Sequence, residues 1–401
     1  MANDIRLIAF YLPQFHAIPE NDAWWGKGFT EWTNTKKAKP LFPGHYLPRI
    51  PADEIGYYDL ADPKTLEKQV DLARQYGLHG FCFYHYWFKG KLLLEKPVES
   101  FLKNKELDFH FCLCWANEPW SRRWHGQEED VLQQQNYGDK EDWIAHFEYL
   151  IPFLKDKRAI KIDGKPVFLT YRIGHVKNVN EMINCWREKA EREGLPGIYV
   201  VSILGSFEDC YRLKGINIDA VCEFVPMYPS SGNRKVKPLR TGEANVYDYD
   251  ASWRDILNRN KIFPVQYKGA FASWDNTPRR GKQGDVWQGS TPKKYKFYLK
   301  QQIKRTLREH ANNGLIFINS WNEWAESCYL EPDKRYGRAY LEATKEALRE
   351  NGKCGAVETI MFKMLSLTDR LALLIEIAII ISKLQLNRYL LWRFKNHRKT
   401  Y

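Results

Sequence analysis

Eight short runs of apolar residues recur along the chain, and none of them strictly alternates apolar with polar positions. A strand that is covered on both faces shows this continuous pattern, whereas a strand with one face in water alternates. The pattern therefore predicts eight strands of a sheet that is buried on both sides. The predicted strands are Ile5–Leu12, Gly80–Phe88, Phe109–Trp115, Val167–Arg172, Ile198–Leu204, Ala220–Val225, Phe263–Phe271 and Gly314–Trp321.

Segments with helical periodicity separate these runs. In the first of them, apolar residues recur three to four positions apart at Leu66, Val70 and Ala73, and a glycine ends the pattern. Asp62–Pro63 and Thr291–Pro292 are pairs of an N-cap residue and a proline that are typical of helix starts. The predicted helices are Lys64–Gly77, Asn180–Gly194, Lys293–His310 and Arg338–Glu350.

Strands that alternate with helices over residues 1–351 favour an α/β fold, a (β/α)8 TIM barrel with loop insertions. A doubly wound open sheet shows the same alternation and is the alternative. Nucleotide-binding open sheets carry a Gly-x-Gly-x-x-Gly turn after a strand, and no predicted strand is followed by one. The barrel is therefore the predicted fold.

The pattern changes in residues 352–401, which contain nine Lys and Arg but only three Asp and Glu. The apolar stretch Leu371–Ile381 is much shorter than the ~20 residues that a membrane-spanning helix needs. Downstream, apolar residues are interleaved with basic ones such as Arg388 and Arg393. We expect a basic amphipathic helical extension that lies on an anionic membrane through residues 371–399. A helix that packs on the barrel or on a second subunit is the alternative.

Charge and cysteine content narrow the function classes. The net charge is +12, about half of it in the C-terminal extension, and no nucleic-acid recognition motif is present, so we expect no nucleic-acid partner. The first residues do not resemble an export signal, so the expected location is the cytoplasm, at the inner face of the plasma membrane if the extension binds lipid. The eight cysteines show no disulfide framework, and Cys112-x-Cys114 has no second Cys/His pair at zinc spacing. We therefore expect reduced thiols, no metal and no cofactor.

Aromatic, amide and charged side chains collect at the carboxyl ends of the predicted strands, where barrel enzymes bind their substrates. Rings stack on sugar faces, and carboxylates and amides bind sugar hydroxyls, so this composition predicts a saccharide site. A hydrogen-bonded core position is the alternative for the two histidines among them. The candidate substrate-binding residues are Tyr11, His16, Tyr84, His85, Tyr86, Trp115, Asn117, Glu118, Arg123, Glu223, Tyr228, Trp321 and Asn322.

Two glutamates, Glu323 and Glu326, directly follow the last predicted strand in the segment NSWNEWAE, each beside a tryptophan. Glycosyl transfer needs one protonated and one ionised carboxyl group near the bond that changes. Burial against tryptophan and mutual repulsion separate the pKa values of two neighbouring glutamates. This pair is therefore the candidate catalytic pair. The alternative is that one of the two is a structural partner of Arg122 or Arg123.

Five segments together resemble the WbsX-type family of lipopolysaccharide-biosynthesis proteins, which is similar to glycoside hydrolase family 99. They are YLPQFHAIPENDAWWGKGFTEWTN, PLFPGHYLPR, GFCFYHYWFKGKLLLEKP, FCLCWANEPWSRRW and NSWNEWAESCYLEPD. The resemblance covers roughly Ile5 to Leu348, and its motifs are long and unusual. It implies a (β/α)8 barrel that acts on glycans, and it adds Trp25 of the first segment to the candidate substrate-binding residues.

The resemblance also implies a mechanism. In family 99, two glutamates three residues apart cleave α-mannosidic bonds with retention. The first takes a proton from the sugar's 2-hydroxyl, which attacks C1 to give a 1,2-anhydro sugar, and the second acts as acid and then as base. These roles fall on Glu323 and Glu326, respectively. Asn117 and Glu118 match the family's Trp-Ala-Asn-Glu segment, and Pro119 stands where family members more often have asparagine, a difference that bears on this loop.

We therefore expect a glycosyltransferase-type enzyme of O-antigen, lipopolysaccharide or other surface-polysaccharide biosynthesis, with retaining transfer at an α-linked, mannose-like sugar. Its expected partners are a glycan or lipid-linked saccharide and a sugar-nucleotide donor, although no Asp-x-Asp metal motif beside a nucleotide-binding α/β half is apparent. The first alternative is a retaining endo-glycosidase, similar to an α-mannosidase, that hydrolyses such glycans. The second is a non-catalytic glycan-binding barrel.

Overall fold

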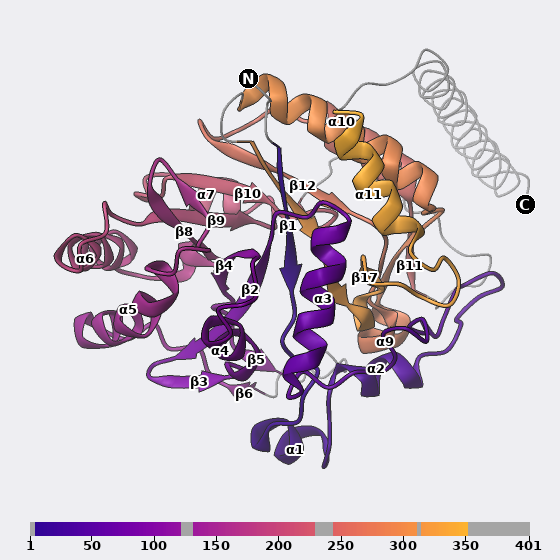
Figure 1. Cartoon of the computed structure of the whole chain (residues 1–401), viewed down its shortest axis with the longest axis horizontal. Helices are drawn as coiled ribbons and strands as arrows, with labels where there is room; N and C mark the ends of the chain where they lie inside the picture. The colour runs from indigo at the N-terminus through magenta and orange to yellow at the C-terminus, as the bar shows by residue number, and fades with distance from the viewer. Residues whose placement is uncertain (1–4, 122–130, 229–243, 311–313, 352–401) are drawn as a thin grey trace, which may run out of the picture. The chain divides into compact units, whose positions relative to one another are not determined.

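The computed structural model describes residues 5–121, 131–228, 244–310 and 314–351. Eight parallel strands form a closed barrel in these residues (Figure 1), because the first strand pairs with both the second and the last. In order around the barrel they are β1 (Arg6–Tyr11), β2 (Gly80–Phe88), β4 (His110–Trp115), β8 (Lys165–Thr170), β9 (Tyr199–Leu204), β10 (Ala220–Glu223), β12 (Gln266–Phe271) and β15 (Leu315–Asn319). Seven of the eight lie within a predicted strand, and β8 begins two residues before the predicted Val167–Arg172. The predicted TIM barrel is confirmed.

The barrel interior is filled with aromatic side chains. Phe10 of β1 lies with its ring centre 5.5–5.7 Å from the rings of Tyr84, Phe224 and Phe317. Tyr84 and Phe317 come from the neighbouring strands β2 and β15, whereas Phe224 follows β10, so the contact with Phe224 crosses the barrel. All nine residues of β2 are buried, as the continuous apolar pattern predicts for a strand covered on both faces.

A helix follows each barrel strand and covers the outside of the barrel. The helices are α3 (Pro63–Gln75), α4 (Lys96–Lys103), α5 (Lys140–Leu154), α6 (Val179–Arg192), α7 (Asp209–Arg212), α8 (Tyr249–Asn258), α10 (Pro292–Glu309) and α11 (Ala339–Arg349). The four predicted helices correspond to α3, α6, α10 and α11. Two of the four that the sequence analysis missed, α4 and α7, are too short for a helical period to stand out.

Both predicted helix starts are confirmed. The side chain of Asp62 accepts a hydrogen bond from the backbone N–H of Lys64, and that of Thr291 accepts one from Lys294. In each case a proline follows the N-cap residue, where its missing N–H costs the helix nothing. These caps fix where α3 and α10 begin.

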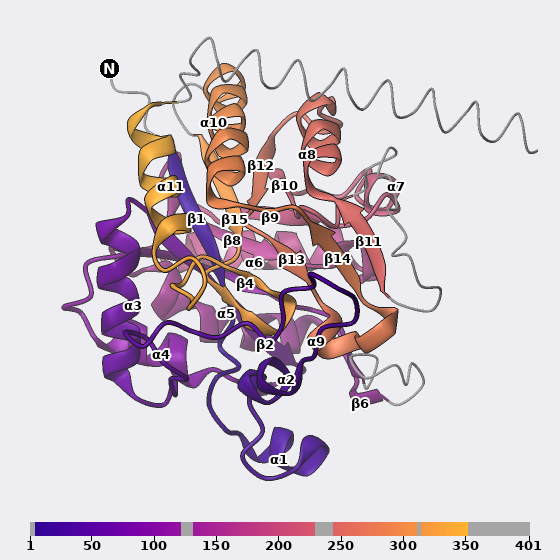
Figure 2. The ribbon, with the colours of Figure 1, turned by 90° about the vertical axis from the view of Figure 1, so that its right-hand side faces the viewer.

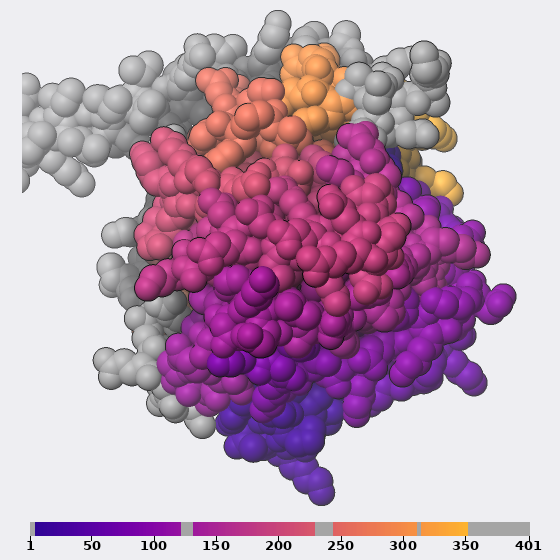
Figure 3. All heavy atoms as spheres, turned by 90° about the vertical axis from the view of Figure 1, so that its left-hand side faces the viewer, coloured from indigo at the N-terminus to yellow at the C-terminus, as the bar shows by residue number. Residues whose placement is uncertain are grey.

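Short insertions follow several strands. They are α1 (Pro19–Trp25), α2 (Glu31–Lys37), β3 (Lys91–Leu93), β5 (Trp120–Ser121), β6 (Val131–Gln133), η2 (Ile173–His175), β11 (Asn245–Asp248), β13 (Trp274–Asp275), α9 (Thr277–Arg280), η3 (Gly281–Gln283), β14 (Asp285–Gln288), β16 (Asn322–Glu323), η4 (Trp324–Glu326) and β17 (Cys328–Tyr329), while β7 (Lys161–Ile162) precedes β8. Figure 2 shows α1, α2 and α9 together at one end of the barrel. The side that α5 and α6 cover is a closed, convex surface (Figure 3).

The predicted C-terminal extension, residues 352–401, and its membrane-binding stretch 371–399 lie outside the described residues. The membrane and docking interpretations of this segment therefore stay predictions. Within the part of the chain that the structure describes, none of the helices has the length and apolar character that crossing a bilayer requires.

One glycine marks a close approach of two barrel strands. A Cβ atom on Gly269 of β12 would lie 2.2 Å from the backbone oxygen of Glu223 and 2.9 Å from a methyl group of Val225. The backbone oxygen of Gly269 also accepts a 2.6 Å hydrogen bond from Gln302 of α10. The strand therefore has no free space to move away from β10.

We expect Gly269→Ala to lower the free energy of unfolding by at least ~3 kcal/mol, because the new methyl group meets backbone atoms that cannot turn aside. Thermal unfolding followed by circular dichroism measures the loss. Ala270→Gly is the matched control: it disturbs the same strand without adding atoms and should cost only ~1 kcal/mol. An unchanged unfolding midpoint for Gly269→Ala would contradict the close approach.

Candidate active site

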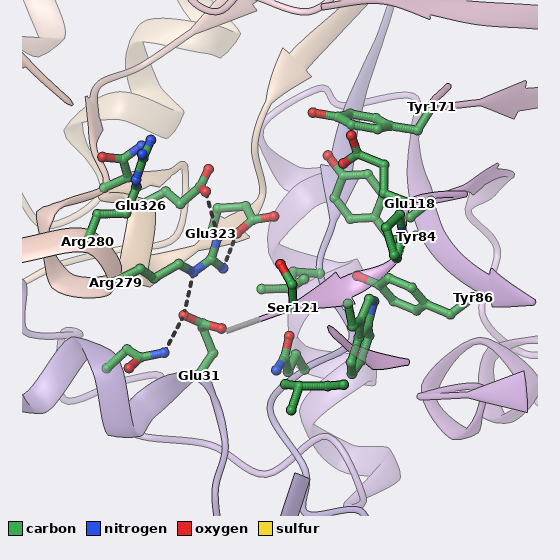
Figure 4. Close-up of a pocket in the computed structure, with 18 of the residues that line it drawn as sticks. Glu31, Tyr84, Tyr86, Glu118, Ser121, Tyr171, Arg279, Arg280, Glu323 and Glu326 are labelled. Atoms are coloured by element: carbon green, nitrogen blue, oxygen red, sulfur yellow. Dashed lines mark hydrogen bonds and ion pairs between the residues drawn. The ribbon is translucent and has the colours of Figure 1, made fainter. Parts of the chain in front are cut away.

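A cavity of about 730 Å³ lies at the carboxyl end of the barrel, among the insertions. One side of it is charged and the other aromatic (Figure 4). Glu31, Arg279, Glu323 and Glu326 form the charged side, and the tyrosines with Glu118 lie across from them. Other lining residues are Leu12, Gln14, Trp25, Phe29, Asn34, Tyr84, Tyr86, Trp120, Tyr171, Arg172, Phe224, Met227, Trp274, Asn276 and Arg280.

A tight hairpin presents the glutamate pair to this cavity. Glu323 lies in β16, which pairs with β17, and Glu326 lies in η4 between the two strands. Ser320 holds the hairpin: its hydroxyl oxygen accepts a hydrogen bond from the backbone N–H of Glu323 and donates to the carbonyl of Cys328. Both glutamates are 8% exposed, and both line the cavity.

Arg279 of α9 connects three carboxyl groups. Its Nη2 lies 2.8 Å from Oε2 of Glu323, its Nη1 lies 2.6 Å from Oε1 of Glu326, and its Nε lies 2.8 Å from Oε1 of Glu31. The guanidinium side chain is 7% exposed. A planar guanidinium donates along several fixed directions, so one arginine can hold all three groups in place.

Burial raises the pKa of Glu323 to about 8 and also raises the pKa of Glu326, while Arg279 acts in the opposite direction on both. Burial also acts to lower the pKa of Arg279, but the three carboxylates raise it well above its usual range. The arginine therefore stays charged, and burial favours a proton on the glutamate pair. Burial and the shared cation act on both carboxyl groups, so the predicted difference in protonation between them stays a prediction.

A buried carboxylate supports the hairpin from behind. Glu331 accepts hydrogen bonds from Trp324 Nε1 at 2.7 Å, from Tyr58 at 2.9 Å and from Gln69 Nε2 at 2.7 Å. Gln69 in turn accepts one from Tyr11 at 2.6 Å. Trp324 lies between the two candidate catalytic residues in sequence, so this network fixes the backbone from which they extend.

A second network holds α9 in place. Nε2 of His45 lies 2.7 Å from Oδ2 of Asp275, and Nδ1 of the same ring accepts from the backbone N–H of Leu41. The other oxygen of Asp275 accepts from the backbone and the hydroxyl of Thr277, the first residue of α9. Arg279 lies two residues further on, so the loop that carries His45 fixes the position of this arginine.

Known proteins resemble this chain both in sequence and in fold. The profile of the family "Glycosyltransferase WbsX" matches residues 7–344. The chain belongs to the WbsX glycosyltransferase family. The family expected from the sequence is thus confirmed.

Two curated relatives of this WbsX-family chain are uncharacterised proteins named WxcX, from two strains of Xanthomonas campestris pv. campestris. They are 40% identical over 348 residues and 38% identical over 352 residues. Each comparison covers 85% of this chain and 49% of the relative. The chain therefore spans about half the length of the curated relatives it matches.

A solved structure with the same fold is the GH99 endo-alpha-mannosidase from Bacteroides thetaiotaomicron. It superposes with a TM-score of 0.53 at 14% sequence identity, over 86% of this chain and 97% of that chain. At this identity the likeness shows a shared barrel fold, in agreement with the strand order described above.

The barrel brings six of the predicted site residues of this WbsX-family chain together in one cavity. They come from the segments after β1 and β4, from β2 and from the hairpin that follows β15, which are far apart in sequence. The six are Trp25, Tyr84, Tyr86, Glu118, Glu323 and Glu326.

Strand alternation turns other predicted residues away from the cavity. Tyr84 and Tyr86 face the cavity, so His85 between them faces α5, where its Nε2 lies 2.9 Å from Nε2 of His146. Burial lowers the pKa of His85 to about 3. Trp115 donates to the carbonyl of Trp87 and is buried as well. A position at a strand end does not by itself show whether a side chain faces the cavity or the surrounding helices. His85 and Trp115 are packing residues and do not line the cavity.

Two predicted residues that follow β15 serve the scaffold. The amide of Asn322 exchanges two hydrogen bonds with the backbone of Leu12, at 2.7 and 3.0 Å. The ring of Trp321 packs on Phe81 of β2. Both are fully buried, and neither lines the cavity.

The remaining predicted residues also have protein partners and lie outside the cavity lining. Tyr11 donates to Gln69, His16 contacts the carbonyl of Pro13 through Nδ1, and Asn117 accepts from the backbone of Arg172. Glu223 accepts from Gln266 and lies 3.5 Å from Lys268, and the ring of Tyr228 lies under Arg259. Their polar groups serve the scaffold because a closed barrel buries the strand ends from which they extend.

Arg122 and Arg123 lie outside the described residues, so the predicted substrate contact of Arg123 stays a prediction. The same holds for the alternative in which one of these arginines pairs with Glu323 or Glu326. The arginine that contacts both glutamates in the structure is Arg279.

The sequence analysis missed Glu31, Tyr171 and Arg279. Glu31 lies within the quoted segment GFTEWTN, but it is separated from β1 by two turns and a helix. Arg279 follows the seventh strand by eight residues, beyond the strand end itself. Glu31 and Glu323 each directly precede a tryptophan, and this repeated pair was a signal for Glu31. In contrast, nothing in the neighbouring sequence distinguished Arg279 from Arg280.

In the described ranges, no group of three or more His, Cys, Asp or Glu side chains is placed to hold a metal ion. The three carboxyl groups of the cavity are instead connected by a guanidinium.

Glu331→Gln tests the network behind the hairpin. Burial raises the pKa of Glu331 from its usual 4.5 to about 7. The folded protein then binds this proton more tightly than the unfolded chain, so the carboxyl contributes stability that is lost as the pH rises from 4.5 to 7. The variant should lose this part of the pH dependence. It should also be ~1–3 kcal/mol less stable at pH 5, because an amide N–H replaces an oxygen that accepts hydrogen bonds.

Unfolding midpoints of both proteins between pH 4.5 and 8 measure the effect. Glu191→Gln, on the exposed side of α6, is the control and should follow the wild-type curve. Parallel curves for Glu331→Gln and the wild type would show that Glu331 titrates normally.

Proposed function

We propose that this chain is a carbohydrate-active enzyme that makes or breaks an α-glycosidic bond through Glu323 and Glu326. The single observation that carries this proposal is the shared guanidinium, which holds one oxygen of each carboxyl group at 2.6–2.8 Å inside a cavity lined by aromatic rings. Two buried carboxyl groups of unequal protonation are what retaining glycosyl transfer requires. Rings on the facing side are suited to stack on a sugar.

The chemistry of the pair follows the sequence of steps that the resemblance implies. One carboxylate removes the proton of the sugar's 2-hydroxyl while that oxygen attacks C1, and the other carboxyl group gives its proton to the departing oxygen. An acceptor hydroxyl then attacks C1, loses its proton to the second carboxylate, and the 2-oxygen regains a proton from the first. Retention results because C1 is attacked twice.

The assignment of the two roles is open to test. The resemblance gives the base to Glu323 and the acid to Glu326. In the free protein, however, burial raises the pKa of both glutamates, to about 8 for Glu323, which favours a proton on the residue that the resemblance makes the base. The resemblance therefore requires the proton to move to Glu326 when a sugar binds, and otherwise the roles are exchanged.

Membership of the WbsX family favours transfer to a sugar acceptor over hydrolysis. We propose that the acceptor is a glycan or lipid-linked saccharide of O-antigen, lipopolysaccharide or another surface polysaccharide, built at the cytoplasmic side of the membrane. The bond would join an α-linked, mannose-like sugar, with a sugar nucleotide as the donor. Hydrolysis of the same class of glycan is the second candidate, favoured by the barrel fold that the chain shares with an endo-alpha-mannosidase.

Single glutamine variants of the pair assign the roles. Each should lower turnover of a natural glycan at least ~100-fold, because general acid and base groups contribute that much or more. A glycosyl fluoride needs no proton on its leaving group. It should therefore restore the first step in the variant of the acid but not in that of the base. On the assignment from the resemblance, Glu326→Gln is rescued and Glu323→Gln is not.

The reverse pattern of rescue would exchange the roles, and rescue of neither variant or of both would contradict the proposed chemistry. Glu118→Gln is a control on the far side of the cavity: it lines the same space but pairs with Arg172, and its variant should not change which leaving groups are accepted.

Substrate screens separate transfer from the alternatives. Sugar-nucleotide donors with a lipid-linked acceptor should give an elongated product, and α-linked oligosaccharides alone should give few new reducing ends. The opposite result favours the hydrolase. Turnover in neither screen, with glycan binding that survives Glu323→Gln, would instead identify a non-catalytic glycan-binding barrel.

The predicted membrane contact has its own test. Removal of residues 353–401 should release the protein from anionic vesicles in a sedimentation assay, because this segment carries about half of the excess positive charge. Neutral vesicles are the control, and the shortened protein should keep the unfolding midpoint of the barrel. Unchanged sedimentation would rule out a membrane role for the extension.

A further inference from the structure

Glu31 is the third carboxyl group that Arg279 contacts. It is the first residue of α2, it is 2% exposed, and Oε1 of its carboxylate lies 2.8 Å from Nε of Arg279. The same oxygen accepts a long hydrogen bond, 3.4 Å, from Asn34. A buried carboxylate is costly unless it is paired, so its place beside the candidate catalytic pair calls for an explanation.

The cluster of Glu31, Glu323, Glu326 and Arg279 carries more negative than positive charge. Three ionised carboxyl groups and one guanidinium would leave two negative charges in a buried space, and one bound proton reduces this to one. The negative charge of Glu31 raises the pKa of both Glu323 and Glu326. Glu31 therefore favours a state in which one proton stays on the pair.

The other ionisable groups near the cluster leave this balance in place. Burial raises the pKa values of Tyr84 and Tyr86 of β2, of Tyr171 after β8 and of Cys328 of β17, so all four are neutral at pH 7. Two further cations lie at the edge: Arg280 of α9 lies 3.9 Å from Asp285, and Lys37 of α2 is exposed.

We propose that Glu31 and Arg279 are positioning residues of this active site: Arg279 fixes the separation of the two catalytic carboxyl groups, and Glu31 fixes Arg279 and keeps one proton on the pair. Figure 4 shows the Arg279 side chain between Glu31 and Glu326, and Glu31 contacts its Nε. The inference rests on the proposed function for its catalytic meaning, but the geometry and the proton balance can be measured without a substrate.

Four variants separate the effect of the negative charge of Glu31 from the effect of its contact with Arg279. Glu31→Gln removes the charge and keeps an oxygen that can accept from Arg279. Glu31→Asp keeps the charge and is one methylene too short for the contact. Arg279→Lys keeps the cation but cannot reach three carboxyl groups from one ammonium. Glu191→Gln, on the exposed side of α6, is the surface control.

The readout is the titration of the two glutamates in protein labelled with ¹³C at the glutamate carboxyl carbon, with signals assigned from Glu323→Gln and Glu326→Gln. We expect Glu31→Gln to move the titration of the pair about one pH unit lower, because a nearby negative charge is lost. Glu191→Gln should titrate as the wild type does. Glu31→Asp should shift the pair less than Glu31→Gln, because it keeps the negative charge and loses only the contact with Arg279. In Arg279→Lys, at least one of the two glutamates should titrate at a higher pH than in the wild type.

The proposal is overturned if Glu31→Gln titrates like the wild type, or if Glu191→Gln shifts the pair equally. Should Glu31→Gln fail to fold, judged by circular dichroism, Arg279→Lys decides, and an unchanged titration in that variant overturns the proposal. In an active enzyme, the basic limb of the kcat profile should move with the titration in Glu31→Gln while KM changes little. If the wild-type protein turns over no glycan, the proposed function is wrong. The titration test still applies, because it needs no substrate.

Discussion

One guanidinium holds the candidate active site together. Arg279 follows the seventh barrel strand and contacts three carboxyl groups from two other loops: Glu31 after the first strand, and Glu323 and Glu326 after the eighth. Without a central cation, three acidic side chains would repel one another in a buried space. With it, they are held close together and still differ in proton affinity. The chemistry that we propose depends on this balance between burial, repulsion and one shared positive charge.

The rest of the barrel serves this arrangement by fixing the segments on which the four side chains lie. Asp275 and His45 fix the start of α9, and Glu331 fixes the hairpin through Trp324. Both networks are made of buried polar groups with nearly all partners satisfied, which gives them directional rigidity that apolar packing lacks. The tyrosines across the cavity extend from the strand β2 or directly follow β8, so the aromatic side needs no comparable support.

The family relationship and the geometry answer different questions. Membership of the WbsX family indicates glycosyl transfer, while the fold is shared with an endo-alpha-mannosidase. These are compatible because a retaining site forms its sugar intermediate before the acceptor enters, and the acceptor decides between transfer and hydrolysis. On the proposed mechanism, the difference between the two outcomes would lie in which acceptor enters the cavity, and not in the carboxyl pair.

The sequence alone determined the barrel, because strands buried on both faces have to be continuously apolar, and all eight were visible as such. It also pointed to Glu323 and Glu326, which directly follow a strand and lie beside tryptophan, and both line the cavity. It could not decide which way His85 or Trp115 faces, since an apolar strand has no polar side to mark its orientation. Nor could it find Arg279, because only the closed barrel brings a residue of α9 against α2 and the last hairpin. Pairing across such distances is a property of the tertiary structure, where burial turns an ordinary arginine into the centre of a site.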